Sequence, residues 1–290
     1  MDPITVAVER GGVVESTHDV HAVRVDDGEI TQAWGNAALV TFMRSAAKPL
    51  QALLLARVYE TLADEELAIA AASHEAAPEQ LEAVKTLLAR SWSSEDDLEC
   101  GPVEGSRLRH NCSGKHAGML AVCAARGWPR EGYRLSGHPL QAEIAEVVTD
   151  AAGAQTAPPT AVDGCGVVTF ALSLAEMARA FGRLGARLLE GADCVVSAMV
   201  ALPELVEGPS RTATRVMKEL PGAVAKGGAE GVLCVGFGDG VGFALKCEDG
   251  SSRPLGPAAA TILNVAALVE MPVENSRGEV VGRVVARDSG

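Results

Sequence analysis

The chain has 290 residues, of which 48% are hydrophobic but only 3% aromatic, and its formal net charge is -13. A chain of this length can bury a large core without disulfide bonds, and so few aromatic side chains leave little to stack single-stranded bases on. The acidic balance, without any Lys/Arg-rich run, argues against nucleic acid or a membrane surface as partner and favours a small substrate.

The N-terminal segment and the cysteines predict a reducing compartment. Residues 1–10 lack the apolar core of a secretory signal, and the apolar stretches are too short to span a bilayer. Seven cysteines without the spacing of a disulfide framework favour free thiols. We therefore expect a cytoplasmic protein, and metal binding by a subset of the cysteines stays open.

The first predicted elements are strands. Short apolar or alternating runs predict them over residues 5–10, 13–16, 20–25 and 30–34. The first two strands flank Gly11-Gly12, and the second two flank Asp26-Asp27-Gly28-Glu29, which are both turn signals. An apolar run over 39–43 then leads to a helix expected around Pro49, because proline is tolerated in a first helical turn.

Helices dominate the middle of the chain. Helical patterns cover residues 64–72, 78–90, 118–126, 139–152, 171–189 and 193–202. Segment 154–160 is the best linker candidate. In the last third, runs over 231–236 and 242–247 predict a hairpin, and the β-branched run 279–286 predicts a terminal strand that can pair with the N-terminal strands.

This order of elements predicts the fold class. Helices that interrupt an antiparallel sheet indicate a mixed α/β (α+β) architecture, with strands near both termini and a helical region between them. We expect one catalytic domain over residues 1–290, with room for two lobes. The apolar surplus and the terminal strands would suit a homodimer.

The first candidate for chemistry is Ser45-x-x-Lys48. A serine hydroxyl is a poor nucleophile until a neighbour removes its proton, and residues three apart on a helix share a face. Lys48 can be that base only when neutral, which burial and the cationic Arg44 would favour. The pattern alone is weak, because a capping serine followed by an exposed lysine has the same spacing.

The second candidate is the segment 110–116, His-Asn-Cys-Ser-Gly-Lys-His, which stands before a helical pattern. Backbone N–H groups at a helix start could hold a carboxylate or an oxyanion. Cys112 and His116 are four apart and could share a metal with Cys165 of Asp163-Gly164-Cys165-Gly166. This is not the paired C-x-x-C spacing of a strong zinc prediction, and a capped helix entrance and a β-turn with a buried thiol remain as alternatives.

Two further segments contain polar residues beside apolar runs. Ser73-His74 follows the apolar run 67–72, and Lys226-Gly227-Gly228-Ala229-Glu230-Gly231 precedes a predicted strand. Alone, the first is typical of a helix end and the second of a flexible turn with a solvated lysine. The glycines do not follow the order of a P-loop or of G-x-G-x-x-G, so a nucleotide-binding fold is not supported.

Taken together, these segments are far more specific than any one of them. In chain order they are Arg44-Ser45-Ala46-Ala47-Lys48-Pro49, Ala72-Ser73-His74, Asn111-Cys112-Ser113-Gly114-Lys115-His116, Asp163-Gly164-Cys165-Gly166 and Lys226-Gly227-Gly228-Ala229-Glu230-Gly231. This order resembles the asparaginase II family, the rhizobial-type L-asparaginases with a serine β-lactamase-like fold. The resemblance runs from about Val8 to Gly282.

The resemblance implies an L-asparagine amidohydrolase that releases L-aspartate and ammonia through an acyl-enzyme. Ser45 and Lys48 match the first Ser–Lys pair of the family, and Ser73 and Lys226 match the second. The matching zinc ligands are Cys112, Lys115 and Cys165, of which the lysine must be neutral to bind metal. The residues expected around the substrate are Arg44, His74, Asn111, Ser113, Gly114, His116, Asp163 and Gly164.

The chain also departs from the family pattern. It has Glu75 in Ser73-His74-Glu75-Ala76-Ala77 where Ser-His-Ser-Gly-Glu is common, Leu202 before Pro203 where His-Pro is usual, and Ala213 in place of the acid of Gly-Arg-x-Asp-Thr. We expect these positions on the rim of the pocket, where they bear on substrate choice and turnover.

Two alternatives follow from these departures. The enzyme alternative is a serine amidase of the same fold that acts on glutamine or on a peptide-like or β-lactam amide. The non-enzymatic alternative is a decayed zinc- or amino-acid-binding protein. A decayed binder would not need the complete set of Ser45, Lys48, Ser73 and Lys226.

Overall fold

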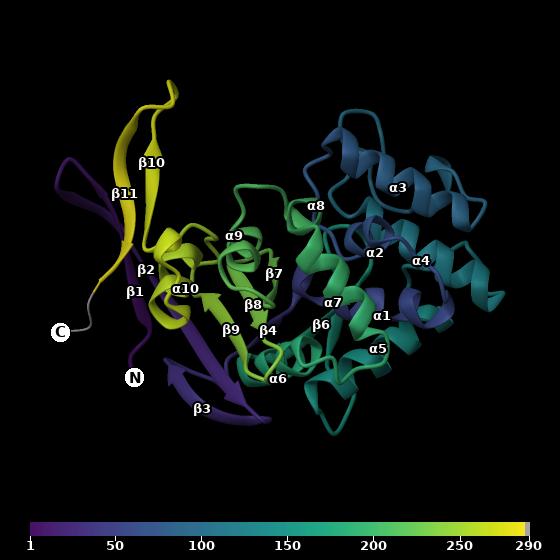
Figure 1. Ribbon diagram of the computed structural model, residues 1–290, viewed down its shortest axis with the longest axis horizontal. Coiled ribbons are helices and arrows are strands. Elements are labelled where there is room, and N and C mark those ends of the chain that lie inside the picture. Colours follow the sequence, from purple (N-terminus) through teal and green to yellow (C-terminus); the bar gives the residue numbers. More distant parts are fainter. Residues whose placement is uncertain (288–290) are drawn as a thin grey trace.

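The computed structural model describes residues 1–287, and an antiparallel sheet forms one end of the molecule (Figure 1). The strands of this sheet are β1 (Ile4–Arg10), β2 (Val13–Asp26), β3 (Glu29–Trp34), β7 (Val224–Gly228), β8 (Val232–Gly236), β9 (Gly242–Cys247), β10 (Glu270–Glu274) and β11 (Val280–Ala286). Their order is β10-β11-β1-β2-β9-β8-β7, and β3 pairs with β2. The predicted return of the terminal strand is confirmed, because Val8 of β1 faces Val284 of β11.

Most of the helices and a small second sheet form the other end, whereas the helix Leu255–Leu263 packs against β1, β10 and β11 (Figure 1). The helices are α1 (Lys48–Val58), α2 (Asp64–Ala70), α3 (Pro78–Arg90), α4 (Ser113–Arg126), α5 (Pro139–Ala152), α6 (Leu174–Gly185), α7 (Ala192–Ala201), α8 (Pro203–Glu207), α9 (Thr212–Glu219) and α10 (Leu255–Leu263). The small sheet has the order β4 (Val40–Phe42), β6 (Val168–Ser173), β5 (Thr160–Val162). The mixed α/β architecture expected of a serine β-lactamase-like fold, with a sheet containing both terminal strands beside a helical region, is confirmed.

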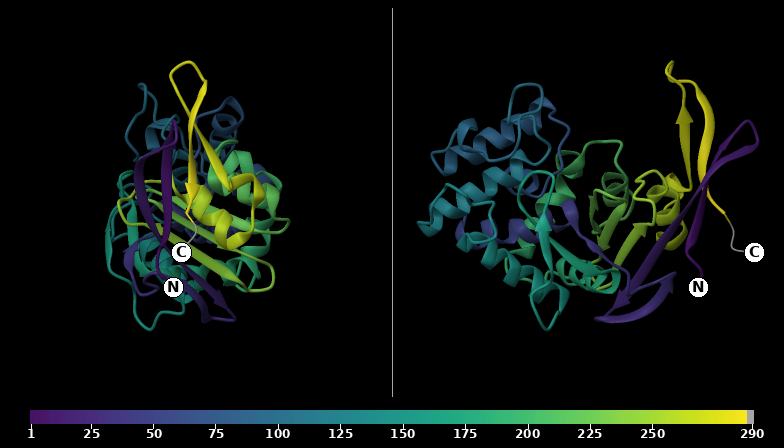
Figure 2. Two further views of the ribbon diagram at one scale, coloured as in Figure 1. Left: turned by 90° about the vertical axis from the view of Figure 1, so that its left-hand side faces the viewer. Right: turned by 180° about the vertical axis from the view of Figure 1, so that it is seen from behind.

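Strand β2 is longer than the sequence predicted. The expected strands over 13–16 and 20–25 are one continuous strand, whose first part pairs with β1 and whose second part pairs with β9. The polar residues between them broke the apolar pattern, yet Thr17 lies opposite Ala7 in the ladder. Pairing of the backbone with β1 therefore continues the strand where the side-chain pattern does not predict it. The turn ends of two hairpins, formed by β1 with β2 and by β10 with β11, extend beyond the body of the molecule (Figure 2).

The helix predicted over 171–189 is wrong at both ends. Residues 171–173 are the end of β6, and α6 begins only after Ser173, whose hydroxyl accepts a hydrogen bond from the Glu176 N–H (3.3 Å) while the Glu176 carboxylate accepts one from the Ser173 N–H (2.7 Å). This capping box fixes the helix start. Helix α6 packs on β2, β8 and β9, and a Cβ on Gly242 would collide with the Ala178 carbonyl oxygen, so only glycine permits this close approach.

Helix α4 also differs from its prediction, because it begins at Ser113 rather than at Gly118. Gly114 and Gly118 weaken a helical pattern. In the structure they let α4 pack tightly on α2, since a Cβ on Gly114 would collide with the Ile69 carbonyl oxygen. The reactive segment before the predicted helix is therefore largely its first turn.

Helix α1 positions one end of the site. It lies among α2, α4, α5 and α7, and its residues 48–55 are all buried. Its first residue, Lys48, is only 1% exposed. Helix burial on all sides fits a core helix, and it fixes the lysine amine at the inner end of the helix.

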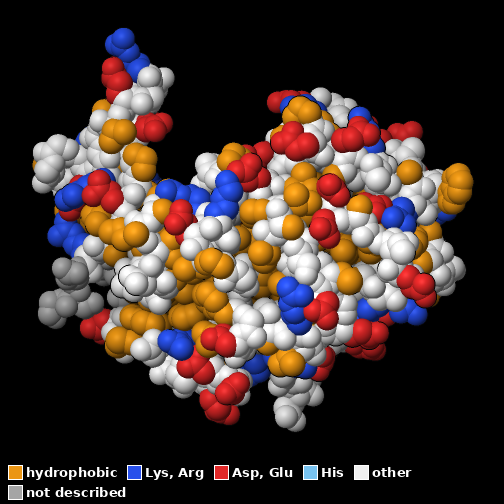
Figure 3. All heavy atoms as spheres, in the orientation of Figure 1, with side chains coloured by type: hydrophobic (Ala, Val, Ile, Leu, Met, Phe, Trp, Pro, Cys, Tyr) orange, Lys and Arg blue, Asp and Glu red, His pale blue; other side chains and the backbone are white. Residues whose placement is uncertain are grey.

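The surface agrees with the acidic composition. On the face shown in Figure 3, basic side chains are scattered among acidic ones and form no broad basic area. None of the helices within residues 1–287 is long and apolar enough to cross a membrane.

The buried carboxylate of Glu66 gives a first prediction. Burial raises the pKa of Glu66, but hydrogen bonds from Arg90 and from the Ala63 N–H outweigh this, so the pKa lies below its ordinary 4.5. Arg90 contacts Glu66 through Nε and, at 2.7 Å, through Nη2. Arg90→Met should lower the unfolding free energy by about 2 kcal/mol, because it leaves the buried carboxylate short of donors.

The pH dependence of this effect has a fixed sign. A carboxylate with a depressed folded pKa contributes stability above its unfolded pKa and loses it as pH falls through the folded pKa. The difference between wild type and Arg90→Met should therefore be full above about pH 4.5 and shrink below it. Urea unfolding at pH 7 and pH 4 measures this, with Lys85→Met on the exposed face of the same helix as control. An equal difference at both pH values would contradict the assignment.

Candidate active site

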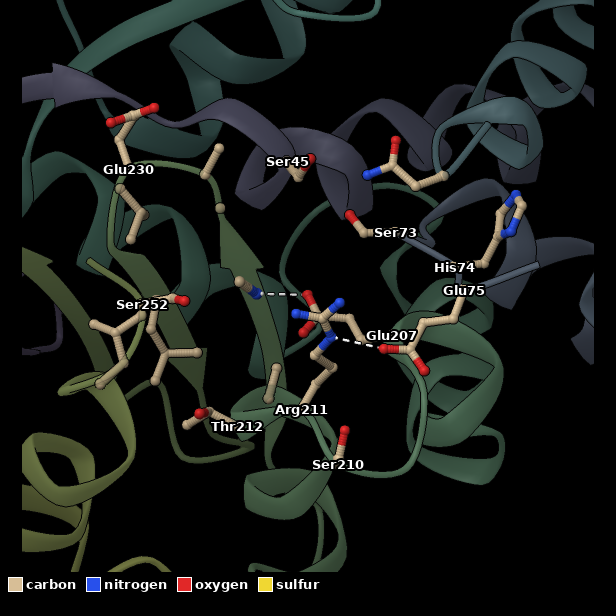
Figure 4. Close-up of a pocket in the computed structure, with 18 of the residues that line it drawn as sticks. Ser45, Ser73, His74, Glu75, Glu207, Ser210, Arg211, Thr212, Glu230 and Ser252 are labelled. Atoms are coloured by element: carbon tan, nitrogen blue, oxygen red, sulfur yellow. Dashed lines mark hydrogen bonds and ion pairs between the residues drawn. The ribbon is translucent and has the colours of Figure 1, made fainter. Parts of the chain in front are cut away.

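A cavity of about 800 Å³ lies where the helical region meets the sheet. Its walls come from the 3₁₀ turn η1 (Arg44–Ala47), the segment after α2, the loop between α8 and α9, and the hairpin of β7 and β8. The predicted residues Ser45, Ser73, His74 and Asn111 all line it. Figure 4 shows Ser45 and Ser73 close to each other on one side of the cavity.

Two buried lysines converge on Ser73. Lys48 Nζ donates to Ser73 Oγ at 2.9 Å and to the Ala72 carbonyl at 2.6 Å. Lys226 Nζ, from β7, lies 2.9 Å from the same Ser73 Oγ. Lys226 is 0% exposed, so it is not the solvated lysine of a flexible turn. The structure thus joins the two predicted Ser–Lys pairs through one hydroxyl.

Ser45 lies in the strained turn η1, directly before α1. The preceding residue, Arg44, has a φ of +51°, a backbone conformation that costs free energy for a side chain of this size and is concentrated at functional sites. Within residues 1–287 the Lys48 amine forms no hydrogen bond with Ser45, and its donors are directed to Ser73 and two carbonyls. Ser45 is half-buried and faces the cavity.

The electrostatic surroundings suit Lys48 as a base. Burial lowers the pKa of Lys48 to about 8, and the positive charges of Lys226 and Lys115 act in the same direction, while Cys112 opposes them. His74, 2% exposed, is kept neutral because burial and the charge of Lys48 lower its pKa to about 4. A general base is most efficient when its pKa is close to the pH at which the reaction runs.

Glu207 was missed from the sequence. It is the last residue of α8, and its Oε1 contacts Lys226 Nζ and accepts a hydrogen bond from the Gly227 N–H at 2.8 Å. It is 7% exposed and lines the cavity. Nothing in Val206-Glu207-Gly208 pairs this acid with a lysine 19 residues further along the chain, so no sequence signal could have identified it.

The rim of the cavity contains two of the three unusual residues. Glu75 accepts a hydrogen bond from Arg211 Nε at 2.9 Å (Figure 4), and Ala213 lies in the wall. Leu202 does not line the cavity, contrary to expectation, because it is the residue between α7 and α8. Position 213, where the family pattern has an acid, is alanine in this chain. The carboxylate that contacts Lys226 comes from Glu207 instead.

The predicted zinc ligands come together beneath the cavity. Cys112, Lys115 and Cys165 are each at most 5% exposed, and Lys115 Nζ donates to Cys165 Sγ at 2.9 Å. A hydrogen bond from Cys165 and the charges of Lys48 and Lys115 hold the pKa of the Cys112 thiol well below its ordinary value, against burial. Burial works to lower the pKa of Lys115, but the two sulfurs outweigh it and raise it.

The donor set fits a zinc ion chemically. Two sulfurs and a nitrogen converge: Cys112 and Lys115 come from the start of α4, and Cys165 comes from the turn 163–166. Thiolate with nitrogen is a ligand combination that zinc prefers. His116 belongs to the alternative set with Cys112 and Cys165. Its Nδ1 lies 2.6 Å from the Tyr133 hydroxyl, and its buried Nε2 has no hydrogen-bond partner among the described residues. Lys115, in contrast, contacts Cys165 Sγ directly, which favours the ligand set that the resemblance implies.

The remaining predicted substrate residues support the walls. Arg44 Nε donates to Asp163 Oδ1 at 2.6 Å, and Gly164 leaves space beside the same guanidinium. The Ser113 hydroxyl is hydrogen-bonded to His74 Nε2 at 2.8 Å. None of the remaining predicted residues, Gly114 and His116 included, lines the cavity.

A second cluster of metal-ligating types lies outside the cavity, at the edge between β2 and β9. His18, Cys247 and Asp249 have ligand atoms within 4.8 Å of one another. The Asp249 carboxylate accepts a hydrogen bond from the Cys247 thiol at 2.9 Å and lies 2.6 Å from His18 Nδ1, while the buried His18 Nε2 has no partner within residues 1–287. These contacts link His18 of β2 to the end of β9.

Comparison with known proteins assigns the chain to a family. No curated protein matches the chain significantly. One solved structure, described as "Crystal Structure Analysis of Mglu in its tris and glutamate form", is 15% identical with a TM-score of 0.38. The match covers 91% of this chain and 64% of that one. A family model described as L-asparaginase II matches residues 6–286, and the chain therefore belongs to the L-asparaginase II family.

Proposed function

We propose that the protein is an amidohydrolase that hydrolyses the side-chain amide of L-asparagine to L-aspartate and ammonia through an acyl-enzyme. Membership of the family supports the reaction class. The observation that carries the proposal is the buried Lys48, whose amine contacts the Ser73 hydroxyl in a cavity that Ser45 also lines, and whose pKa is lowered to about 8 by burial. A serine needs such a neighbour to become a nucleophile.

The proposed reaction begins at Ser45. Its Oγ attacks the carboxamide carbon, and the neutral amine of Lys48 takes the proton of the hydroxyl. The C–N bond of the tetrahedral intermediate then breaks, and the nitrogen leaves as ammonia with a proton supplied through Ser73. Water attacks the ester of Ser45 with aspartate, which releases the acid and restores the serine.

Ammonia release from L-asparagine is the direct test. The purified chain should release ammonia from L-asparagine and form L-aspartate in equal amounts, with slower release from L-glutamine, whose amide lies one methylene further from the α-carbon. Release from glutamine alone would assign another substrate amide to the same site. Release from neither, in the presence of zinc, would overturn the assignment of L-asparagine as substrate and leave a peptide-like or β-lactam amide, or a binding protein, as the alternatives.

Zinc is proposed as the resident metal of Cys112, Lys115 and Cys165. Bound there, it would supply a fixed positive charge or a Lewis acid close to the cavity. The chain's own contribution is to hold two sulfurs and an amine in one buried place, and to release the proton on Lys115 when metal binds. A homodimer and a cytoplasmic location remain predictions from the sequence.

Loss of one sulfur tests the metal site. Cys165→Ser should reduce the zinc bound after dialysis against a weak chelator to a small fraction of the wild-type content, because the site loses a thiolate ligand. Zinc affinity of the wild type should rise with pH, since the ligands must lose protons. Metal analysis of both proteins measures this, with the exposed Cys194→Ser as control. Equal zinc in all three would place the metal elsewhere.

A further inference from the structure

Glu207 has no role in the reaction as written so far, yet it contacts one of the two buried lysines at Ser73. Its carboxylate touches Lys226 Nζ and is anchored by the Gly227 N–H at 2.8 Å. Glu207 is 7% and Lys226 0% exposed. Burying an ion pair costs free energy unless hydrogen bonds satisfy both charges. A buried pair beside the cavity is therefore a candidate for a functional role.

The two lysines differ in their partners. Lys226 contacts a carboxylate, whereas Lys48 contacts two carbonyls and the Ser73 hydroxyl. Burial favours the neutral form of an amine, whereas a carboxylate in contact with it favours the ammonium. In the described part of the chain Lys48 has no carboxylate contact of this kind, and Cys112, whose charge opposes the effect of burial on the Lys48 pKa, only partly offsets it. Both amines lie 2.9 Å from Ser73 Oγ. One side of this hydroxyl therefore faces an ammonium and the other a potential base.

We propose that Glu207 is a positioning residue that keeps Lys226 as the ammonium proton donor for the leaving ammonia. This inference rests on the proposed function. When the C–N bond of the tetrahedral intermediate breaks, the nitrogen takes the proton of the Ser73 hydroxyl, and Ser73 takes one from Lys226 Nζ. Lys226 is left as a neutral amine beside the Glu207 carboxylate, and it recovers its proton from the water that attacks the acyl-enzyme.

This role predicts a dependence on the leaving group. An amide nitrogen must be protonated to leave, whereas methanol leaves from an ester with far less help. Glu207→Gln should lower kcat for L-asparagine about a hundredfold, as for loss of a general acid. The KM for L-asparagine and the kcat for L-aspartate β-methyl ester should stay within about threefold of wild type, since binding and the later step are retained.

Two further variants complete the experiment. Glu207→Asp retains a carboxylate and should recover part of the amide kcat. Glu204→Gln removes an exposed carboxylate of the same helix, which pairs with Lys218 outside the cavity, and should leave both activities unchanged. If Glu207→Gln does not fold, as judged by thermal unfolding, Glu207→Asp on the two substrates makes the same comparison.

The outcomes separate the two proposals. Wild type that hydrolyses neither the amide nor the ester overturns the proposed function. Wild type that is active, with Glu207→Gln equally slow on amide and ester or unaffected on both, overturns the role of Glu207. A loss confined to the amide supports it.

Discussion

Ser45→Ala is expected to lower kcat for L-asparagine by a factor on the order of 10⁴ or more, because the acyl-enzyme cannot form without its nucleophile. The exchange removes one oxygen from a half-buried side chain at the cavity wall, so the fold should stay intact. The measurement is ammonia release under saturating L-asparagine, with thermal unfolding of the variant beside it. Unchanged turnover would exclude Ser45 as the nucleophile.

The competing nucleophile is Ser73, whose hydroxyl already bonds to Lys48 at 2.9 Å. Rapid acid quenching of wild type with L-asparagine, followed by peptide mass spectrometry, locates the aspartyl group. We expect it on the peptide containing Ser45. An adduct on the peptide containing Ser73 would reverse the roles of the two serines and leave the proposed reaction otherwise intact.

Lys48→Met should lower kcat by a factor of about 10³, since it removes the base and keeps the length of a side chain that is 1% exposed. Lys48→Arg should be similarly inactive, because a guanidinium stays protonated. If the lysine supplied only positive charge, arginine would retain much of the activity. Lys85→Met, on the exposed side of α3, is the control and should match wild type.

Several elements were predictable because their signals are local. Helices α3 and α5 have the predicted bounds, since each begins with a proline that suits a first turn, and α5 ends at Gly153 in the left-handed conformation. The hairpin of β8 and β9 was predicted from two apolar runs around a glycine-rich turn. The polar part of β2 and the start of α4 depend on contacts with residues far away in the sequence. The local hydrophobic pattern therefore did not predict them.

The site shows the same division. The sequence alone determined which residue types are present and in what order, and this order identified the family and placed Ser45 and Lys48 at one helix start. Only the tertiary structure decided that the amines of Lys48 and Lys226 both contact the Ser73 hydroxyl, and that Glu207 contacts Lys226. The reason is physical: local spacing fixes neighbours within a helical turn, whereas sheet pairing and burial bring together side chains separated by 153 residues.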